Sequence, residues 1–352
     1  MFVAIRDLRF AKGRFALMGA VVTLITLLVV LLSGLTAGLG RGNTSAITDL
    51  TADHLVFSAP AAGQKLSFTD SAIPPQVQAD WATVPGVVRA DPISIAMSRI
   101  SSGNRTSGVA VFSVPTGSPL APAVGAGKVG LTSKAAEALG AVAGDRIELA
   151  GKPVTVAAVA GSDEFSHAPL VWASQTDQPT SGQPTGTASV IALQTTGGDL
   201  AQADQRLGTV TVTPGDSLAA IGSYSSENGS LQLMRLLLFA ISALVIGAFF
   251  TVWTVQRSGE IAILKAVGAS TGYLLKDALG QAFALLLIGT TTGTLLATGI
   301  GALAGSAVPF VLDLSTLLFP AAVMILLGLL GAAVSLRRVT TVDPLTALGS
   351  AR

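Results

Sequence analysis

Four apolar runs constrain this chain more than any other feature, because each is long enough to cross a lipid bilayer. A helix needs about 20 apolar residues to span roughly 30 Å of hydrocarbon. Only 12% of the 352 residues are charged, against about 25% in a soluble globular protein. The sequence therefore predicts a membrane protein with four transmembrane α-helices, at residues 15–40, 231–256, 273–308 and 309–336.

The first apolar run could instead belong to a cleaved signal peptide, because basic residues precede it. The run covers residues 15–39, which is longer than the roughly 7–15 residues of a signal peptide's apolar region. No small-residue cleavage site closes it. We therefore favour a permanent membrane anchor.

The segment between the first two runs, residues 41–230, has the size of a domain. Alternating residues at 154–157 and 209–213 predict short strands. Residues 133–139 predict one helix, with Ser133 as its N-cap and Gly140 as its stop. The insert is therefore predicted to be a mixed α+β domain.

Two polar stretches of the insert predict irregular structure. Residues 169–187 are rich in Pro, Thr, Gln and Gly and predict an exposed loop. Residues 222–230 are polar and predict a linker into the second span.

Loop charge predicts the orientation of the chain. Basic residues near the spans gather in segments 1–14, 257–276 and 337–352, and such residues favour the cytoplasmic side. Arg41 and Arg235 oppose this arrangement but are outnumbered. The predicted plan is a cytoplasmic N-terminal segment at 1–14, an extracellular α+β domain at 41–230, a cytoplasmic coupling helix at 257–272 and a cytoplasmic tail at 337–352.

Composition excludes several classes of function. The net charge of +1 gives no reason to expect nucleic acid as a partner. The absence of cysteine excludes disulfides, thiolate catalysis and cysteine metal sites. The two histidines, His54 and His167, are not joined by a recognisable nucleophile and orienting group. We therefore expect no catalytic residues and no enzyme activity.

Two further patterns point only weakly to a ligand site. Asp163 and Glu164 near His167 could bind a cation, but a solvated polar turn is the reading that we favour, so no metal site is predicted. The stretch GAGK at 125–128 does not complete a phosphate-binding loop, because proline holds the first glycine position at 122. Any ATP would therefore be bound by another subunit.

Pairs of glycines four residues apart recur in the spans. Such pairs let helices approach closely, either within one chain or between the chains of a dimer. They are Gly34 with Gly38, Gly289 with Gly293, and Gly301 with Gly305.

Polar side chains gather where the insert enters the second span. An ionisable group in a membrane segment is by default a hypothesis about function, although Arg235 could simply reach the lipid headgroups. The residues are Tyr224, Glu227, Gln232, Met234 and Arg235.

The loop between the second and third spans reads RSGEIAILKAVGAS at 257–270. Ile261, Leu264 and Val267 recur near helical spacing, which predicts an amphipathic helix at the membrane surface. Such a helix suits docking into a groove of another protein.

This loop resembles the signature of the FtsX/MacB-type ABC-transporter permeases, Glu-Ile-Ala-x-Leu-Lys-Ala-x-Gly-Ala-Ser. The stretch AAVSLRRVTTVDPLTALG at 332–349 resembles that family's closing motif, with Asp343, Pro344, Ala347 and Leu348 at its positions. Residues 133–159 resemble the family's periplasmic-type core domain. Together the resemblances cover one span, a large outer domain and three further spans.

The resemblance implies a dimeric permease, a homodimer or a heterodimer, that works with two copies of a cytoplasmic ABC ATPase. The partner would bind ATP and Mg²⁺, and this chain would bind no cofactor. In this family the loop between the second and third spans is the coupling helix. Carried over to this sequence, the ATPase contacts are Glu260, Leu264, Lys265, Gly268 and Ala269.

Length and layout are most similar to the haem-exporter permeases of Gram-positive bacteria within this family, which implies efflux of haem from the outer leaflet of the plasma membrane by mechanotransmission. Haem iron accepts His, Met, Tyr or carboxylate ligands. For Met234 alone, ordinary apolar packing is favoured over iron binding. The candidate substrate-binding residues are Met234, Glu227, Tyr224, His167, His54 and Arg235.

Other functions remain open at this point. The chain could be a signalling permease without a substrate that acts on a partner in the cell envelope. It could also export a peptide, a lipid or an antibiotic.

Overall fold

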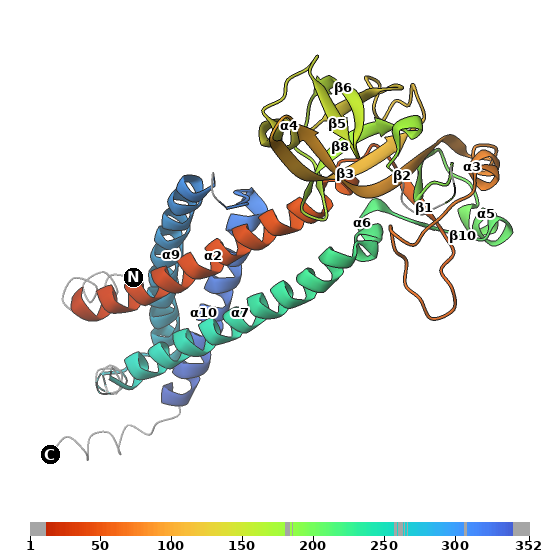
Figure 1. Ribbon diagram of the computed structural model, residues 1–352. Coiled ribbons are helices and arrows are strands. Elements are labelled where there is room, and N and C mark those ends of the chain that lie inside the picture. Colours follow the sequence, from red (N-terminus) through yellow and green to blue (C-terminus); the bar gives the residue numbers. More distant parts are fainter. Residues whose placement is uncertain are drawn as a thin grey trace. The chain divides into compact units, whose positions relative to one another are not determined.

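The computed structural model describes residues 12–179, 184, 186–256, 259, 263, 265, 267–305 and 308–340. The chain forms two compact units, whose elements are drawn in Figure 1. The membrane unit combines Met1–Gly38 with Ser230–Arg352, and the insert unit is Leu39–Gly229.

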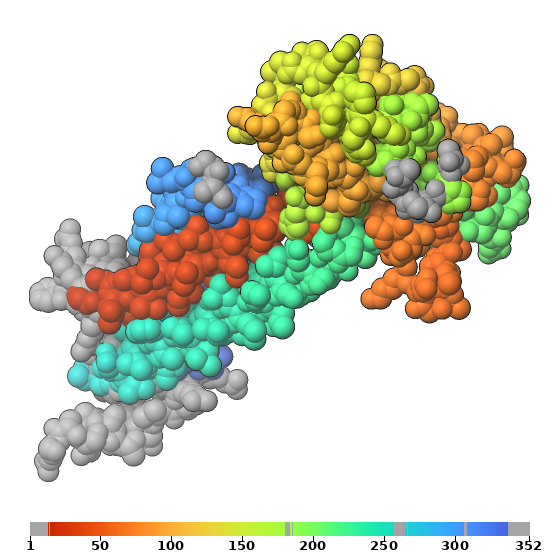
Figure 2. Space-filling model, viewed as in Figure 1, coloured from red at the N-terminus to blue at the C-terminus, as the bar shows by residue number. Residues whose placement is uncertain are grey.

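Four long helices confirm the four predicted spans, since each is long and apolar enough to cross a membrane. Their outer surfaces are apolar. Leu236, Ile241 and Leu244 of α7, for example, are all more than half exposed, and α7 is drawn in green to cyan in Figure 2. The helices are α2 (Lys12–Thr48), α7 (Gly222–Gln256), α9 (Thr271–Ala304) and α10 (Leu314–Thr340).

The glycines of α9 pack against α2. A side chain at Gly293 would come within 2.6 Å of the Thr23 carbonyl oxygen and 2.8 Å of Thr26 Cβ, and one at Gly289 would come within 2.7 Å of Val22. Such proximity leaves no room for a Cβ. This pair of glycines therefore serves packing within the chain.

A second close approach involves the loop before α10. The ring of Phe310 lies against Gly34 and Gly301, and the Pro309 carbonyl lies against Gly38. Gly305 meets only the carbonyl oxygens of its own helix. The close approaches made by Gly34, Gly38 and Gly301 are therefore also within the chain.

The ends of the helices differ from the sequence-based boundaries. The helix α2 continues to Thr48, beyond the expected end at 40, and α7 begins at Gly222, within the expected linker 222–230. Ala46 and Ile47 explain the first difference, because both are buried in the core of the insert unit. The last turns of α2 are therefore stabilised by packing against the insert unit, which a hydropathy profile does not detect. In the remaining spans, α9 ends at Ala304 rather than 308, and α10 begins at Leu314 rather than 309.

The described residues of the insert unit form ten strands, in the order β10-β1-β9-β2-β3-β8-β4-β6-β5 with β7 paired to β8. The longest strand, β2, contributes to two parts of this sheet. Its first half pairs with β9, and its second half pairs with β3 and also with β5. The strands are β1 (His54–Ser58), β2 (Val87–Ser102), β3 (Arg105–Val114), β4 (Lys128–Leu131), β5 (Arg146–Leu149), β6 (Lys152–Val159), β7 (Glu164–Phe165), β8 (Ala168–Ser174), β9 (Val190–Thr195) and β10 (Thr209–Val212).

The pairing of β2 with β5 closes six strands into a barrel. Ile100 of β2 faces Leu149 of β5, and both side chains are fully buried together with Val111 and Val129. A separate core lies under the open part of the sheet, where Trp81 packs with residues of β1 and β9. Short helices complete the unit: α3 (Pro75–Trp81), α4 (Ser133–Leu139), η1 (Gln175–Asp177), α5 (Leu200–Leu207), α6 (Pro214–Ser217) and η2 (Leu218–Ala220).

The exposed loop predicted at 169–187 is wrong for its first part. The strand β8 occupies Ala168–Ser174, with Leu170 fully buried. It pairs in parallel with β3 and antiparallel with β4. The loop-like composition of 169–187 comes mainly from the residues after 174, whereas 170–173 are apolar. Residues 180–183 and 185 lie outside the described part of the chain.

The predicted bounds of α4 are confirmed, whereas its predicted N-cap is wrong. The helix covers Ser133–Leu139 as expected, and Gly140 ends it in the left-handed conformation with φ 66°. The N-cap is Thr132 rather than Ser133, whose hydroxyl donates instead to the Gly161 carbonyl at 2.9 Å. The strands predicted at 154–157 and 209–213 correspond to β6 and β10.

Candidate functional site

The candidate site lies in the insert unit, at the turn between β7 and β8. Two residues of this turn, Ser166 and His167, have positive φ values of 52° and 63°. Such values are uncommon outside glycine. The turn is held by α2, since the Ser166 amide donates to the Asn43 carbonyl at 3.0 Å and the His167 amide donates to the Gly42 carbonyl at 2.9 Å.

Five polar side chains meet at this turn and form what we call the junction cluster: Asn43, Ser166, His167, Ser223 and Glu227. Asn43 Nδ2 lies 2.8 Å from His167 Nε2 and donates to Glu227 Oε2 at 2.9 Å. His167 Nε2 lies 2.9 Å from the same Glu227 oxygen. Ser223 donates to Asn43 Oδ1 at 2.6 Å and lies 2.8 Å from the Ser166 hydroxyl.

The three contacts at the centre of the cluster cannot all be hydrogen bonds at the same time. Asn43 Nδ2 can only donate, and Glu227 Oε2 accepts from it, so the direction of the Asn43–Glu227 hydrogen bond is fixed. His167 Nε2 either accepts from Asn43 or donates to Glu227, depending on where its proton lies. The neutral imidazole with its proton on Nδ1 leaves Nε2 with the lone pair that metals bind.

Burial differs across the junction cluster. Asn43 is 1% exposed, whereas the side chains of His167 and Glu227 are 37% and 42% exposed. A ligand could therefore reach the imidazole and the carboxylate but not the amide. This arrangement makes Asn43 a positioning residue for the two exposed groups.

A second set of contacts ties the same hairpin to α2. Ser45 accepts from the Glu164 amide at 2.8 Å, and its own hydroxyl donates to the Glu164 carbonyl at 3.3 Å. The Glu164 carboxylate pairs with Lys134 of α4 at 2.6 Å. Glu164 is thus engaged in structure, and no group of three or more His, Cys, Asp or Glu residues able to hold a metal ion is found among the described residues.

Asp163 differs from its neighbours in its titration. Burial raises the pKa of its carboxyl above the ordinary value, and the charge of Asp49 and a hydrogen bond to it raise this pKa further. Arg41 acts in the opposite direction. Asp163 therefore holds a proton more readily than an exposed aspartate.

The predicted substrate-binding residues do not all come together. His167 and Glu227 meet in the junction cluster. Tyr224 packs against the apolar core of the insert unit. His54 lies in β1, where it pairs with Leu193, and its buried Nδ1 has no hydrogen-bond partner among the described residues.

The other two candidates belong to the membrane unit. Met234 is 53% exposed on α7. The Arg235 guanidinium carbon lies 5.9 Å from the centre of the Phe319 ring of α10, within the range of a cation–π contact.

The predicted coupling helix is described only in part. Glu260 and Leu264 lie outside the described residues. Lys265 is helical, Gly268 has φ 103°, and Ser270 caps α9 by accepting from the Tyr273 amide. A helical turn therefore ends at a glycine directly before α9.

Sequence reasoning missed three residues of the junction cluster: Asn43, Ser166 and Ser223. A polar residue at the end of an apolar run offers a weak signal for Asn43. The two serines carry none, because their hydroxyls meet each other and the Asn43 side chain only in the folded chain.

Two family models together match most of the chain. The model described as the MacB-like periplasmic core domain matches residues 15–228, and the FtsX-like permease C-terminal model matches residues 233–344. The two matches cover the first span with the inserted domain and the last three spans. The predicted fold class, four spans with an α+β domain inserted after the first, agrees with both.

Relatives of known name match along their whole length. A protein of Staphylococcus epidermidis, provisionally named hemin transport system permease protein HrtB, is 26% identical over 356 residues, with 99% of each chain covered. An uncharacterised ABC transporter permease of Mycobacterium tuberculosis is 25% identical over 360 residues, again with 99% of each chain covered.

Among solved structures, the extracellular domain of the transporter YknZ matches with a TM-score of 0.33 and 14% identity, covering 48% of this chain and 93% of that domain. This likeness is too low to carry an argument. The assignment depends on the sequence models, one of which spans more than half of the chain. The chain belongs to the FtsX/MacB-type family of ABC-transporter permeases.

Proposed function

We propose that this permease is the membrane subunit of an ATP-driven efflux pump that extrudes haem from the outer leaflet of the plasma membrane of a Gram-positive bacterium. Two copies of the chain would work with two copies of a cytoplasmic ABC ATPase. ATP and Mg²⁺ would be bound by that partner. Both termini would lie in the cytoplasm and the insert unit outside.

The observation that carries the choice of haem is the full-length similarity to a hemin transport permease. The junction cluster adds chemical support, because it exposes one imidazole and one carboxylate side by side. Both are ligands that haem iron accepts. Binding of iron by His167 Nε2 requires its contacts with Asn43 and Glu227 to open, so haem would compete with the cluster.

The proposed orientation rests on charge. Basic residues follow the second span and the fourth span, in segments 257–276 and 337–352. The positive-inside tendency favours a cytoplasmic position for both segments. This orientation would put the loop of Glu260, Leu264, Lys265, Gly268 and Ala269 on the ATPase side, where the family resemblance implies a coupling role for these residues.

Mechanotransmission is supported by the continuity of the helices with the insert unit. The last turns of α2 and the first turns of α7 lie within the insert unit and meet in the junction cluster. A movement of either helix along its axis would therefore stretch or break the hydrogen bonds that Asn43 and Glu227 make. The β7–β8 hairpin is held by the same bonds.

A spectroscopic titration tests the choice of haem. The permease is reconstituted with its ATPase in nanodiscs and titrated with haemin while the Soret band is followed. We expect a saturable shift near one haem per dimer that weakens in His167→Ala and Glu227→Gln. The matched control is Glu137→Gln on α4, an exposed carboxylate outside the cluster, which should leave the titration unchanged.

A linear uptake without a spectral shift, and without any change in ATPase rate, would remove haem as the substrate. That result would favour the second candidate, a signalling permease whose insert unit acts on an envelope partner. The junction cluster favours this candidate as well, because a hydrogen-bonded link between two helices transmits force whether or not a substrate is bound.

A further inference from the structure

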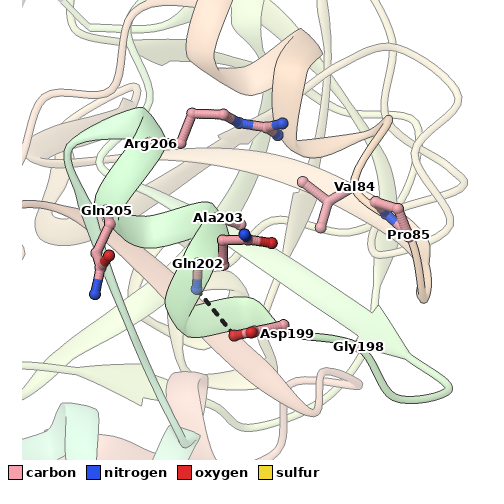
Figure 3. A pocket seen from close by; sticks show the side chains of 8 residues that line it. All are labelled: Val84, Pro85, Gly198, Asp199, Gln202, Ala203, Gln205 and Arg206. Atoms are coloured by element: carbon pink, nitrogen blue, oxygen red, sulfur yellow. Dashed lines mark hydrogen bonds between the residues drawn. The ribbon is translucent and has the colours of Figure 1, made fainter.

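We propose that a pocket between α5 and the loop before β2 binds a short peptide with free ends. The pocket belongs to the insert unit and holds about 550 Å³, a size within the usual range for small ligands. Figure 3 shows its lining from two segments. These are Val84 and Pro85 on one side, and Gly198, Asp199, Gln202, Ala203, Gln205 and Arg206 on the other.

The floor of the pocket is rigid. Ala203 and Val84 are buried in the core that contains Trp81. Asp204, on the opposite face of α5, accepts from the Thr209 hydroxyl at 2.7 Å and from the Thr211 amide at 2.9 Å. The helix is thereby fixed to β10, so a ligand would meet a preformed surface.

The rim is fixed by the loop before β2 and the loop before α5, whose backbones are in contact. Gly198 has φ 132°, and a side chain there would collide with the Pro85 carbonyl. Gly86 has φ 87° and would collide with Gly197, while its carbonyl accepts from the Thr196 amide at 2.9 Å. Glycine is required at both positions for the loops to approach this closely. The crossing holds Pro85 at a set distance from the start of α5.

Charges of opposite sign stand at the two ends of the pocket. Asp199 caps the start of α5 by accepting from the Gln202 amide at 3.0 Å, and Arg206 lies in its last turn. Arg206 follows Asp199 by seven positions, which corresponds to roughly 10 Å along the helix axis. In Figure 3, Arg206 reaches over toward Val84, and Asp199 lies at the other end of the helix.

The polar side chains that line the pocket have hydrogen-bond donors and acceptors available for a ligand. Among the described residues, no hydrogen bond or ion pair engages the side chains of Gln202, Gln205 or Arg206. The Asp199 carboxylate has a second oxygen beyond the one that caps α5. Gln202 lies between the two charges and offers both a donor and an acceptor.

A tripeptide matches this arrangement. Three extended residues span roughly 10 Å, which would place the ammonium group at Asp199 and the carboxylate at Arg206. Arginine binds a carboxylate through two parallel N–H donors. The peptide's side chains would pack on Val84 and Pro85, and its amides would pair with Gln202. A ligand with only one charge would leave one end of the pocket unused.

Calorimetric titration of the full permease in nanodiscs with trialanine tests the proposal. We expect saturable binding that weakens about tenfold or more when the peptide is N-acetylated or C-amidated. Asp199→Asn should reproduce the effect of acetylation, since asparagine caps a helix as well as aspartate does. Arg206→Gln should reproduce the effect of amidation. Arg146→Gln, an exposed arginine on β5, is the matched control.

Absence of saturable binding up to about 10 mM trialanine, which corresponds to a very small binding free energy, would overturn the proposal. Sensitivity to amidation and Arg206→Gln alone would overturn it too, because the pocket would then be a simple anion site. Unchanged thermal unfolding of each variant establishes that lost binding is not lost folding. The outcome is independent of haem export, since none of these residues belongs to the junction cluster.

Discussion

His167 and Glu227 lie 60 residues apart in the sequence, yet the imidazole Nε2 and the carboxylate Oε2 are separated by 2.9 Å. The contact joins the β7–β8 turn to the first turns of α7. Asn43, from the last turns of α2, reaches both atoms. One hairpin of the insert unit therefore contacts both the end of α2 and the start of α7.

Asn43→Ala should destabilise the insert unit by about 1–3 kcal/mol, because a buried amide loses its hydrogen bonds and leaves polar partners unsatisfied. The change is read as a lower unfolding temperature of the full chain and as faster amide exchange in β7 and β8. Asn104→Ala, at an exposed turn position, is the control. Equal behaviour of the two variants would show that the junction cluster carries no stability.

Asp163→Asn should stabilise the chain near neutral pH. The folded state raises the pKa of this carboxyl, so folding binds a proton more strongly than the unfolded chain does. Stability then falls as pH rises from the unfolded value of 3.8 through the folded pKa. The asparagine variant lacks this loss. Unfolding measured across pH should show its advantage above that window and none below it; an advantage that is independent of pH would refute the explanation.

Gly293→Ala in α9 should lower the unfolding temperature, since the added methyl would enter the space of Thr23 and Thr26. Overpacking of this kind typically costs about 1–3 kcal/mol. Gly299→Ala in the same helix has nothing within 4 Å of the new Cβ. It should be neutral or stabilising, because alanine favours a helix by about 1 kcal/mol over glycine. If both variants behave alike, the close approach of α2 and α9 is not as described.

Gly268→Val should uncouple ATP hydrolysis from export while leaving the chain folded and inserted. The φ of 103° at this position excludes a β-branched residue without strain. The measurements are export and ATPase activity of the reconstituted complex, together with the unfolding temperature. Gly272→Ala, in the first turn of α9 with open space around it, is the control. Normal export by Gly268→Val would place the coupling contact elsewhere.

Hydropathy identified the four spans because length and apolarity are properties of the segment alone. The helix α4 and its stop at Gly140 were predictable for a similar reason, since capping is local. The strand β8 was not predicted, because its short apolar run at 170–173 lies between Pro169 and the polar residues that begin at Ser174, and only pairing with β3 and β4 makes it a strand.

The candidate site also combines residues that the local sequence indicates with residues that only tertiary contacts identify. His167 and Glu227 could be nominated by residue type, and the prediction that they bind substrate stays untested. Their partner Asn43 could not be nominated, because its value depends on α2 continuing past residue 40 into the insert unit. Contacts between residues 124 and 184 positions apart are decided by tertiary structure.

The strand order of the insert unit also bears on how the protein is made. Strand β1 pairs with β9 and β10, so Leu55 waits for Ala192 and Val212 to be synthesised before its ladder exists. Contacts of such long range slow folding. The first strand must therefore remain unpaired on these edges until almost the whole insert has left the ribosome and crossed into its compartment. This interval is when a membrane-associated chaperone would be needed most.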